Sequence, residues 1–193
     1  MFPDSAALIV IDVQKAIDHP SWGRRNNPQA EANIARLIDA WRRAERRVIH
    51  VRHHSREPQS TYRPGQPGCE FKDCARPAAG ETVVTKHVTS AFIGTDLERI
   101  LREGGHHVLV MAGAITNNSV EATARMAGNL GFEVNVVCDA TFTFDRQALD
   151  GSLHKAEDVY AHSLANLNGE YARIIDTAGV IAEQSVQSWR QAP

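Results

Sequence analysis

Two short, wholly apolar runs constrain the fold of this chain more than any other feature of its sequence. They are residues 6–11 and residues 108–112. Both have the length and aliphatic content of a strand that is buried on both faces. Strands of this kind are typical of a parallel sheet that is covered by helices on each side. The sequence therefore predicts an α/β protein with these runs near the centre of its sheet.

The remaining segments alternate between strand-like and helix-like patterns. Further strands are expected at residues 48–51, 81–85, 133–137 and 174–175, and helices at residues 28–46, 95–104, 119–130, 156–168 and 178–187. Alternating strands and helices predict a parallel, doubly wound sheet with right-handed crossovers. With 193 residues and no linker-like segment, we expect one domain over residues 1–193, a three-layer α/β/α fold with a mostly parallel six-stranded sheet.

Composition excludes several classes of function. The formal net charge is −2 and no block of Lys or Arg stands out, which disfavours binding to nucleic acid or to a membrane surface. No apolar run reaches the length of a membrane span, and the N-terminus lacks a basic segment followed by an apolar one. We therefore expect a cytoplasmic protein whose partner is a small-molecule substrate.

Chemically useful side chains follow three different predicted strands. Asp12 follows the first apolar run, Lys86 follows the strand at residues 81–85, and Ser119 lies in the turn after the second apolar run. In doubly wound sheets, ligands bind beyond the carboxyl ends of the strands, where the strand order reverses. A carboxylate, an ammonium and a hydroxyl brought together there can act as proton carrier, cation and nucleophile. The alternative is structural, with an ordinary salt bridge and a serine that caps a helix.

The turn between residues 113 and 119 leads from a strand into a helix. Asn118, with Glu121 three residues later, resembles a capping box, so the helix is expected to begin at about Ser119. Its unpaired backbone N–H groups and positive dipole end would then point at the space above the strand. A group placed there can stabilise an oxyanion.

Several other residues are candidates for a substrate pocket. The Pro- and Gly-rich segment 56–80 is expected to pass over the strand ends. Arg52, His53 and His54 follow the second strand, and Asn118 lies in the turn beside Ser119.

Aromatic side chains could complete that pocket. We expect Phe92 and Phe142 to form an apolar wall for a small planar or cyclic substrate, although each could instead belong to the core.

The motifs together resemble the isochorismatase-like cysteine hydrolases, a group that includes nicotinamidases, N-carbamoylsarcosine amidohydrolase and streptothricin hydrolase. The resemblance extends over nearly the whole chain. It is carried by residues 7–14 (ALIVIDVQ), Lys86 with residues 90–97 (SAFIGTDL), residues 113–125 (GAITNNSVEATAR) and residues 129–132 (NLGF).

The resemblance implies roles for individual residues. Asp12 would correspond to the catalytic aspartate and Lys86 to the catalytic lysine. The peptide bond between Ala114 and Ile115 would be cis, and the N–H groups of Ile115 and Ser119 would form the oxyanion hole.

The sequence departs from this family at the nucleophile. Ser119 occupies the position at which the amidase members have cysteine, and a hydroxyl requires a stronger base than a thiol does. Ser119 could be a native nucleophile, an engineered replacement that traps substrate, or part of a protein without covalent chemistry. We favour hydrolysis of an amide-like C–N bond. The alternatives are isochorismatase-type hydrolysis of a vinyl ether and a catalytically silent ligand-binding protein.

No metal or other cofactor is expected. Nicotinamidases hold a metal with an Asp and histidines after the second strand, but residues 52–55 (RHHS) lack an Asp-x-His spacing. Adjacent histidines on an extended chain point in different directions and do not readily bind one ion together.

Family members are commonly oligomers, so a homodimer or homotetramer is expected. The helix faces near Val120 and Leu164 are the candidate interfaces.

Overall fold

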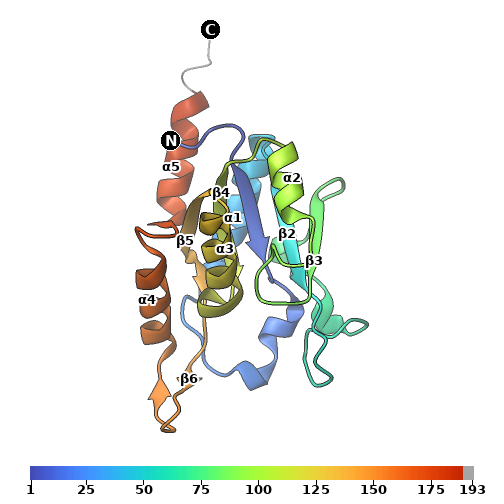
Figure 1. Cartoon of the computed structure of the whole chain (residues 1–193), viewed down its shortest axis with the longest axis vertical. Coiled ribbons are helices and arrows are strands. Elements are labelled where there is room, and N and C mark those ends of the chain that lie inside the picture. The colour runs from blue at the N-terminus through green and yellow to red at the C-terminus, as the bar shows by residue number, and fades with distance from the viewer. Residues whose placement is uncertain (189–193) are drawn as a thin grey trace.

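A central parallel sheet organises the computed structural model, which describes residues 1–188 (Figure 1). Within these residues the main sheet has six strands in the order β3-β2-β1-β4-β5-β8. The strands are β1 (Ala7–Ile11), β2 (Val48–His53), β3 (Thr82–Lys86), β4 (Val108–Ala114), β5 (Glu133–Phe142) and β8 (Arg173–Ile175). All neighbouring pairs in this sheet are parallel.

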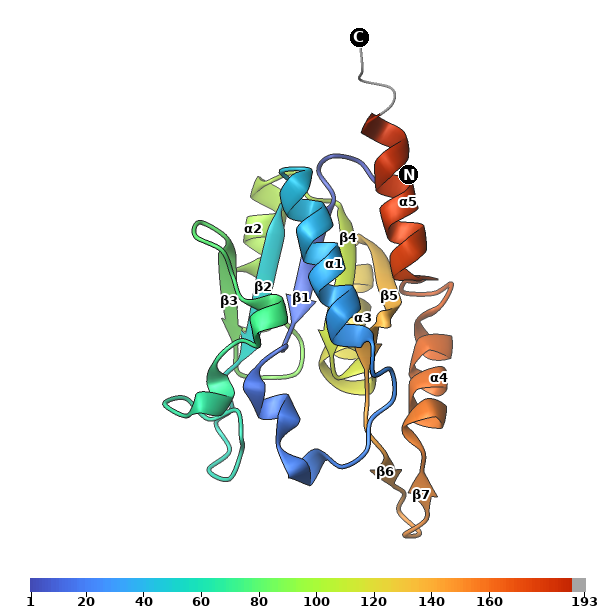
Figure 2. The ribbon, with the colours of Figure 1, turned by 180° about the vertical axis from the view of Figure 1, so that it is seen from behind.

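Helices cover both faces of the sheet. They are α1 (Ala30–Arg43), α2 (Leu97–Glu103), α3 (Glu121–Asn129), α4 (Ala156–Leu167) and α5 (Thr177–Ser188). Helices α2, α3 and α4 lie in front of the sheet in Figure 1, and α1 and α5 lie in front of it when the molecule is turned around (Figure 2). The α/β/α layering and the doubly wound sheet confirm the predicted fold. The last five residues of the predicted domain lie outside the described part of the chain.

The first apolar run is buried on both faces because its side chains alternate between two cores. Ile9 and Ile11 pack with α2 and α3, whereas Leu8 and Val10 pack with α1. All four side chains are buried. This arrangement explains why the run contains no polar residue, since neither face of β1 meets water.

The sheet order reverses beside β1, and this creates the crevice in which a site is expected. From β1 the chain forms β2 and then β3 on one side of β1. It then crosses back and forms β4 on the other side of β1. The carboxyl ends of the strands point toward the lower edge of Figure 1, where residues 12–29 and the first part of segment 56–80 pass beyond the sheet. The prediction that segment 56–80 lies over the strand ends holds for its first part, which includes Ser60 and Tyr62. Its last part packs beside α1, where Ala75 is buried, and leads back to the amino end of β3.

The helix after β4 begins differently from the capping-box prediction. Thr116–Val120 form a π-helical turn, and α3 starts at Glu121 without a side-chain cap. The Glu121 carboxylate instead accepts hydrogen bonds from Arg125 and from Ser163 on α4. Val120 is completely buried and faces the core, whereas Leu164 on α4 is only partly buried.

Two further features of the fold were not predicted. Strand β5 continues to Phe142, with an irregular register opposite the stretch from Met111 to Gly113. A small antiparallel hairpin, β6 (Arg146–Gln147) and β7 (Leu153–His154), follows it. Each hairpin strand has only two residues, which is too short to show a periodic pattern in the sequence. No helix in residues 1–188 is long and apolar enough to cross a membrane.

Candidate active site

Lys86, Asp12 and Ser119 meet at the carboxyl edge of the sheet, as the sequence predicts. The Lys86 Nζ atom lies 2.6 Å from Asp12 Oδ2 and 3.2 Å from Ser119 Oγ. All three side chains are buried, and that of Lys86 is completely inaccessible. The ammonium therefore bridges a carboxylate and a hydroxyl in a site with little access to water.

Local backbone geometry places each of these groups. Asp12 directly follows β1 and has a positive φ of 53°, which turns the chain away from the strand direction. Lys86 is the last residue of β3, and its ammonium also donates to the Val88 carbonyl oxygen at 3.2 Å.

The turn that carries Ser119 is closed around one carbonyl group. The backbone N–H groups of Asn118 and Val120 both donate to the Ile115 carbonyl oxygen, at 3.0 and 3.3 Å. The peptide bond between Ala114 and Ile115 is cis. This turn brings the Ser119 hydroxyl to the end of β4 beside the Lys86 ammonium.

Burial makes Asp12 more basic than an exposed carboxylate. Loss of hydration raises the pKa of Asp12, and the Lys86 ammonium and the Ser119 hydroxyl oppose that shift. One carboxylate oxygen, Oδ2, contacts Lys86, whereas the buried Oδ1 accepts no hydrogen bond from any described residue. Asp12 thus presents one free oxygen that can receive a proton.

These groups border a small cavity of about 150 Å³. Its volume is close to that of an engineered protein cavity that binds benzene. The lining residues are Asp12, Trp22, His53, Ser60, Tyr62, Thr89, Ala114, Ile115, Asn118 and Ser119. Among these described lining residues Asp12 alone is a carboxylate and none is Lys or Arg, so the cavity fits a small uncharged group.

His53 lines the cavity in its neutral form. Burial and the nearby Lys86 ammonium lower the pKa of His53 to about 4. Its Nδ1 atom lies 3.5 Å from Lys86 Nζ, farther away than the oxygen atoms of Asp12, Ser119 and Val88. Because an ammonium has only three N–H donors, these shorter contacts already use its hydrogen-bonding capacity.

The neighbours of His53 do not line the cavity, contrary to expectation. Arg52 donates through Nε to Thr85 Oγ1 at 2.8 Å, and His54 lies beside His87, with ring centroids 6.4 Å apart. Successive side chains of an extended segment point to opposite sides. With His53 directed into the cavity, the flanking residues are directed away from it.

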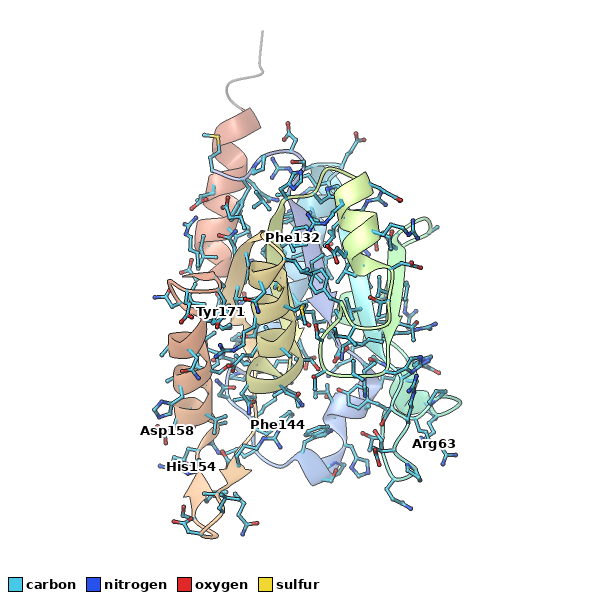
Figure 3. The ribbon with its side chains drawn as sticks, in the orientation of Figure 1. Arg63, Phe132, Phe144, His154, Asp158 and Tyr171 are labelled. Carbon is cyan, nitrogen blue, oxygen red and sulfur yellow. The ribbon has the colours of Figure 1, made fainter. Side chains whose placement is uncertain are left out.

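The two predicted aromatic wall residues are also absent from the cavity lining. Phe92 belongs to the core and packs against Phe132, which lies just before β5 and away from the strand tips (Figure 3). Phe142 is completely buried at the end of β5, where the guanidinium of Arg25 covers its ring at 4.0 Å. Both residues are therefore core residues, which was the alternative considered from the sequence.

The aromatic residues that line the cavity come from the long loops. Trp22 and Tyr62 lie with their ring centroids 6.4 Å apart, and Tyr62 meets the edge of His53 at 5.7 Å. Trp22 also stacks on Phe144, at 5.3 Å. Trp22 is the only large apolar residue in its polar loop. This feature of the sequence could have identified Trp22 as a residue that lines the cavity.

Gln14 is a positioning residue that sequence reasoning missed. Its side chain is completely buried, and its amide donates to the carbonyl oxygens of His53 and Cys69, each at 3.0 Å. Its Oε1 atom accepts a hydrogen bond from the His53 N–H at 2.6 Å. Gln14 therefore ties the end of β2 to the loop that covers the cavity and holds His53 in place.

The site does not have the donor set that a metal requires. In the described part of the chain, no group of three or more His, Cys, Asp or Glu side chains is placed to hold an ion. His53 Nδ1 faces the Lys86 ammonium, which is an unsuitable neighbour for a metal ligand.

The comparisons with known proteins agree on one protein family. A model of the isochorismatase domain matches residues 6–178. The chain is 38% identical over 178 residues to YrdC, an uncharacterised isochorismatase-family protein of Bacillus subtilis (strain 168), and the match covers 92% of this chain and 95% of YrdC. An isochorismatase-family crystal structure from Chromobacterium violaceum ATCC 12472 has a TM-score of 0.93 and 52% identity, with 96% of both chains covered. Nicotinamidase 3 of Arabidopsis thaliana is 29% identical over 184 residues, which are 89% of this chain and 84% of that protein.

Proposed function

Because the chain belongs to the isochorismatase family, we propose that it hydrolyses an amide-like C–N bond in a small molecule, with Ser119 as the nucleophile. The observation that carries this proposal is the position of the Lys86 ammonium, 2.6 Å from Asp12 Oδ2 and 3.2 Å from Ser119 Oγ. A cation that contacts the serine oxygen lowers the cost of forming an alkoxide. The free Oδ1 atom of Asp12 supplies a base for the serine proton.

The first half of the reaction forms an acyl-enzyme. Ser119 Oγ bonds to the substrate carbonyl carbon while its proton passes to Asp12. The tetrahedral intermediate then collapses, the C–N bond breaks, and the Asp12 proton moves to the departing nitrogen. Lys86 keeps its proton throughout and balances the negative charge, which moves from Asp12 to the substrate oxygen.

The second half reverses these roles for water. Asp12 takes a proton from water, the hydroxide attacks the Ser119 ester, and the proton returns to Ser119 as the acid leaves. We assign the developing oxyanion to the backbone N–H groups of Ile115 and Ser119. The turn closed around the Ile115 carbonyl supports this assignment, because it holds both residues in a fixed conformation.

The cavity favours an uncharged reacting group over a dianionic one. Isochorismate carries two carboxylates, and burying an unpaired carboxylate is costly. Among the described residues that line the cavity, none is Lys or Arg, and the adjacent Lys86 is already paired with Asp12. A planar amide head of roughly the size of benzene meets no such penalty.

A screen of small amides tests the proposal. Ammonia or amine release is measured for the wild type and for Ser119→Ala, and we expect kcat/KM to fall by about 10³-fold or more in the variant. Ser119→Cys should retain hydrolysis, because a thiolate beside Lys86 is a strong nucleophile. Full activity in Ser119→Ala would exclude the covalent mechanism.

The same variants separate the competing functions. Turnover of isochorismate that survives Ser119→Ala but not Asp12→Ala would replace the amidase proposal with vinyl ether hydrolysis. No turnover of any amide or of isochorismate by the wild type or by Ser119→Cys, together with saturable ligand binding, would indicate a binding protein.

A further inference from the structure

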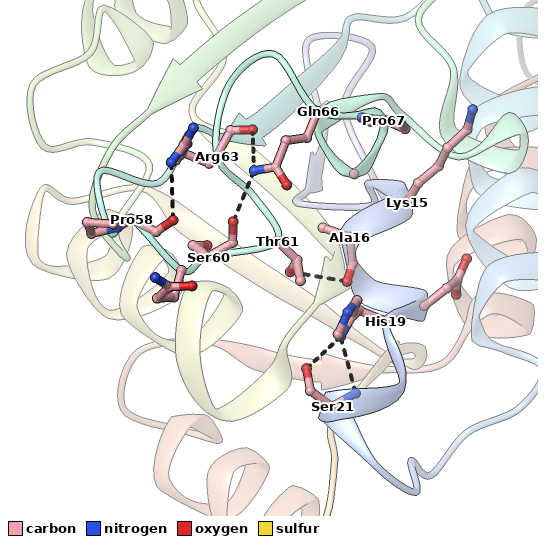
Figure 4. Close-up of a pocket in the computed structure, with 13 residues that line it drawn as sticks. Lys15, Ala16, His19, Ser21, Pro58, Ser60, Thr61, Arg63, Gln66 and Pro67 are labelled. Atoms are coloured by element: carbon pink, nitrogen blue, oxygen red, sulfur yellow. Dashed lines mark hydrogen bonds between the residues drawn. The ribbon is translucent and has the colours of Figure 1, made fainter.

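A second hollow, larger than the catalytic cavity, lies directly beside it. This outer groove has a volume of about 890 Å³ and runs between residues 15–21 and residues 58–68 (Figure 4). Its volume is within the range of protein pockets that hold whole ligands, whereas the catalytic cavity of about 150 Å³ is well below it. The catalytic cavity can therefore hold only one end of a substrate of ordinary size.

The two hollows adjoin along a wall that includes Ser60. Ser60 borders both of them, while Tyr62 borders the catalytic cavity and Thr61 borders the outer groove. On the other side of the wall, Trp22 faces the catalytic cavity and Ser21 faces the outer groove. A substrate that occupies both hollows would have to cross this wall at Ser60, the residue that they share.

One backbone carbonyl group accepts hydrogen bonds from both sides of this wall. The Ala16 oxygen accepts a hydrogen bond from Trp22 Nε1 at 3.0 Å and another from Thr61 Oγ1 at 3.5 Å. The Ser60 hydroxyl accepts from the Tyr62 N–H at 3.1 Å. The same short segments thus shape both hollows, so an occupant of one is positioned relative to the other.

One exposed cation of the outer groove, Arg63, has no acidic partner among the described residues. Lys15 is paired with Glu70, and Asp18 is paired with Lys72. Arg63 contacts the Pro58 carbonyl oxygen at 3.3 Å but forms no ion pair with any carboxylate among residues 1–188. Its guanidinium is the cation left without a countercharge in this groove.

We propose that the substrate has two parts, an uncharged planar amide head that enters the catalytic cavity and a polar tail that ends in a carboxylate beside Arg63 in the outer groove. This inference rests on the proposed function, because it names the substrate class of that site. A guanidinium pairs with a carboxylate through parallel N–H bonds, which makes Arg63 a determinant of specificity. The catalytic groups would then determine which bond is cleaved, and the outer groove would determine which molecules bind.

Matched amides test this inference. Benzoylglycine, benzoyl-β-alanine and benzoyl-4-aminobutyrate are compared with their methyl esters, and amine release is measured for the wild type, Arg63→Gln and Arg43→Gln. We expect at least one carboxylate to be preferred over its ester. In Arg63→Gln that preference should fall about fivefold, mainly through KM. Arg43 is exposed at the end of α1 and does not line the groove, so Arg43→Gln should keep the preference.

A binding measurement separates failure of this inference from failure of the proposed function. Calorimetry with Ser119→Ala should show tighter binding of the carboxylate than of its ester, and Arg63→Gln should remove the difference. If binding follows this pattern but no amide is hydrolysed, the groove assignment holds and the amidase proposal fails. Equal binding of acid and ester, no binding of either, or equal effects of Arg63→Gln and Arg43→Gln would overturn the inference.

Discussion

The Lys86 ammonium and the Asp12 carboxylate lie 2.6 Å apart and form an ion pair with almost no exposure to solvent. Burying two charges costs hydration free energy, which their mutual attraction recovers only while both partners are present. The pair therefore links stability to the site, since removal of either charge leaves the other buried without its partner.

Removing one member of this pair should destabilise the fold more than removing both. Lys86→Met leaves Asp12 unpaired and should lower the free energy of unfolding by about 3–5 kcal/mol. The double variant Asp12→Asn with Lys86→Met should recover much of that loss, although it should have no amidase activity. Urea unfolding measures both effects. Arg99→Met serves as the control, because Arg99 belongs to an exposed ion pair with Glu103 and its loss should change stability little. A double variant less stable than Lys86→Met would contradict this account.

His53 should make the protein less stable in acid. Its pKa is about 4 in the folded protein and about 6.5 in an unfolded chain, so between these values the unfolded chain binds a proton that the folded protein does not. Stability contributed by neutral His53 is therefore present above pH 6.5 and lost as the pH falls toward 4. His53→Gln should show a shallower decline over this range in urea unfolding at a series of pH values. A residual slope is expected from His50, whose pKa is also lowered by burial. An unchanged slope would show that His53 is not held neutral.

Gln14 should support both the fold and the site. Gln14→Leu leaves backbone groups of His53 and Cys69 without their buried partner, and we expect a loss of about 2 kcal/mol in the free energy of unfolding. Because His53 lines the cavity, KM for amides should also rise. Gln66→Leu is a suitable control for stability, since the hydrogen bonds that the Gln66 side-chain amide donates lie in an exposed loop. A comparable loss of stability in both variants would show that Gln14 contributes no more to stability than an exposed loop residue does.

Gly113 should tolerate no side chain. A Cβ atom there would lie 2.1 Å from the Ile11 carbonyl oxygen, and φ at this glycine is +127°. Gly113→Ala would force β1 and β4 apart beside Asp12, at an expected cost of about 3 kcal/mol or more, with loss of activity. Gly131→Ala provides the comparison, because its φ is +84° but a Cβ atom there meets nothing within 4 Å. It should cost only about 1–2 kcal/mol for the left-handed backbone. Thermal unfolding of both variants distinguishes the steric cost from the backbone cost.

The fold and the three central groups of the site were predictable because they depend on local patterns. The runs at residues 6–11 and 108–112 show by composition alone that they are buried on both faces. Since parallel strands end at one edge of a sheet, the residues that follow them, Asp12 and Lys86, were expected to meet. The structure brings them together with Ser119.

The start of α3 was mispredicted because a local signal competed with tertiary contacts. Asn118 and Glu121 have the spacing of a capping box, but Glu121 bonds to Ser163 on another helix. The backbone then follows a π-helical turn, which sequence spacing does not reveal. Contacts made across a large sequence separation overrode the local preference here.

By itself, the sequence determined the layered sheet, the strands that carry the site, and the meeting of Asp12, Lys86 and Ser119. The reason is that hydrophobic periodicity and strand direction can be predicted from short local segments of the chain. Only the tertiary structure decided which side chains line the cavity beside Ser119. Trp22, Ser60 and Tyr62 line it, while Phe92 and Phe142 belong to the core. The physical reason is that long loops have no repeating pattern, so the direction of their side chains is set by packing between segments distant in sequence.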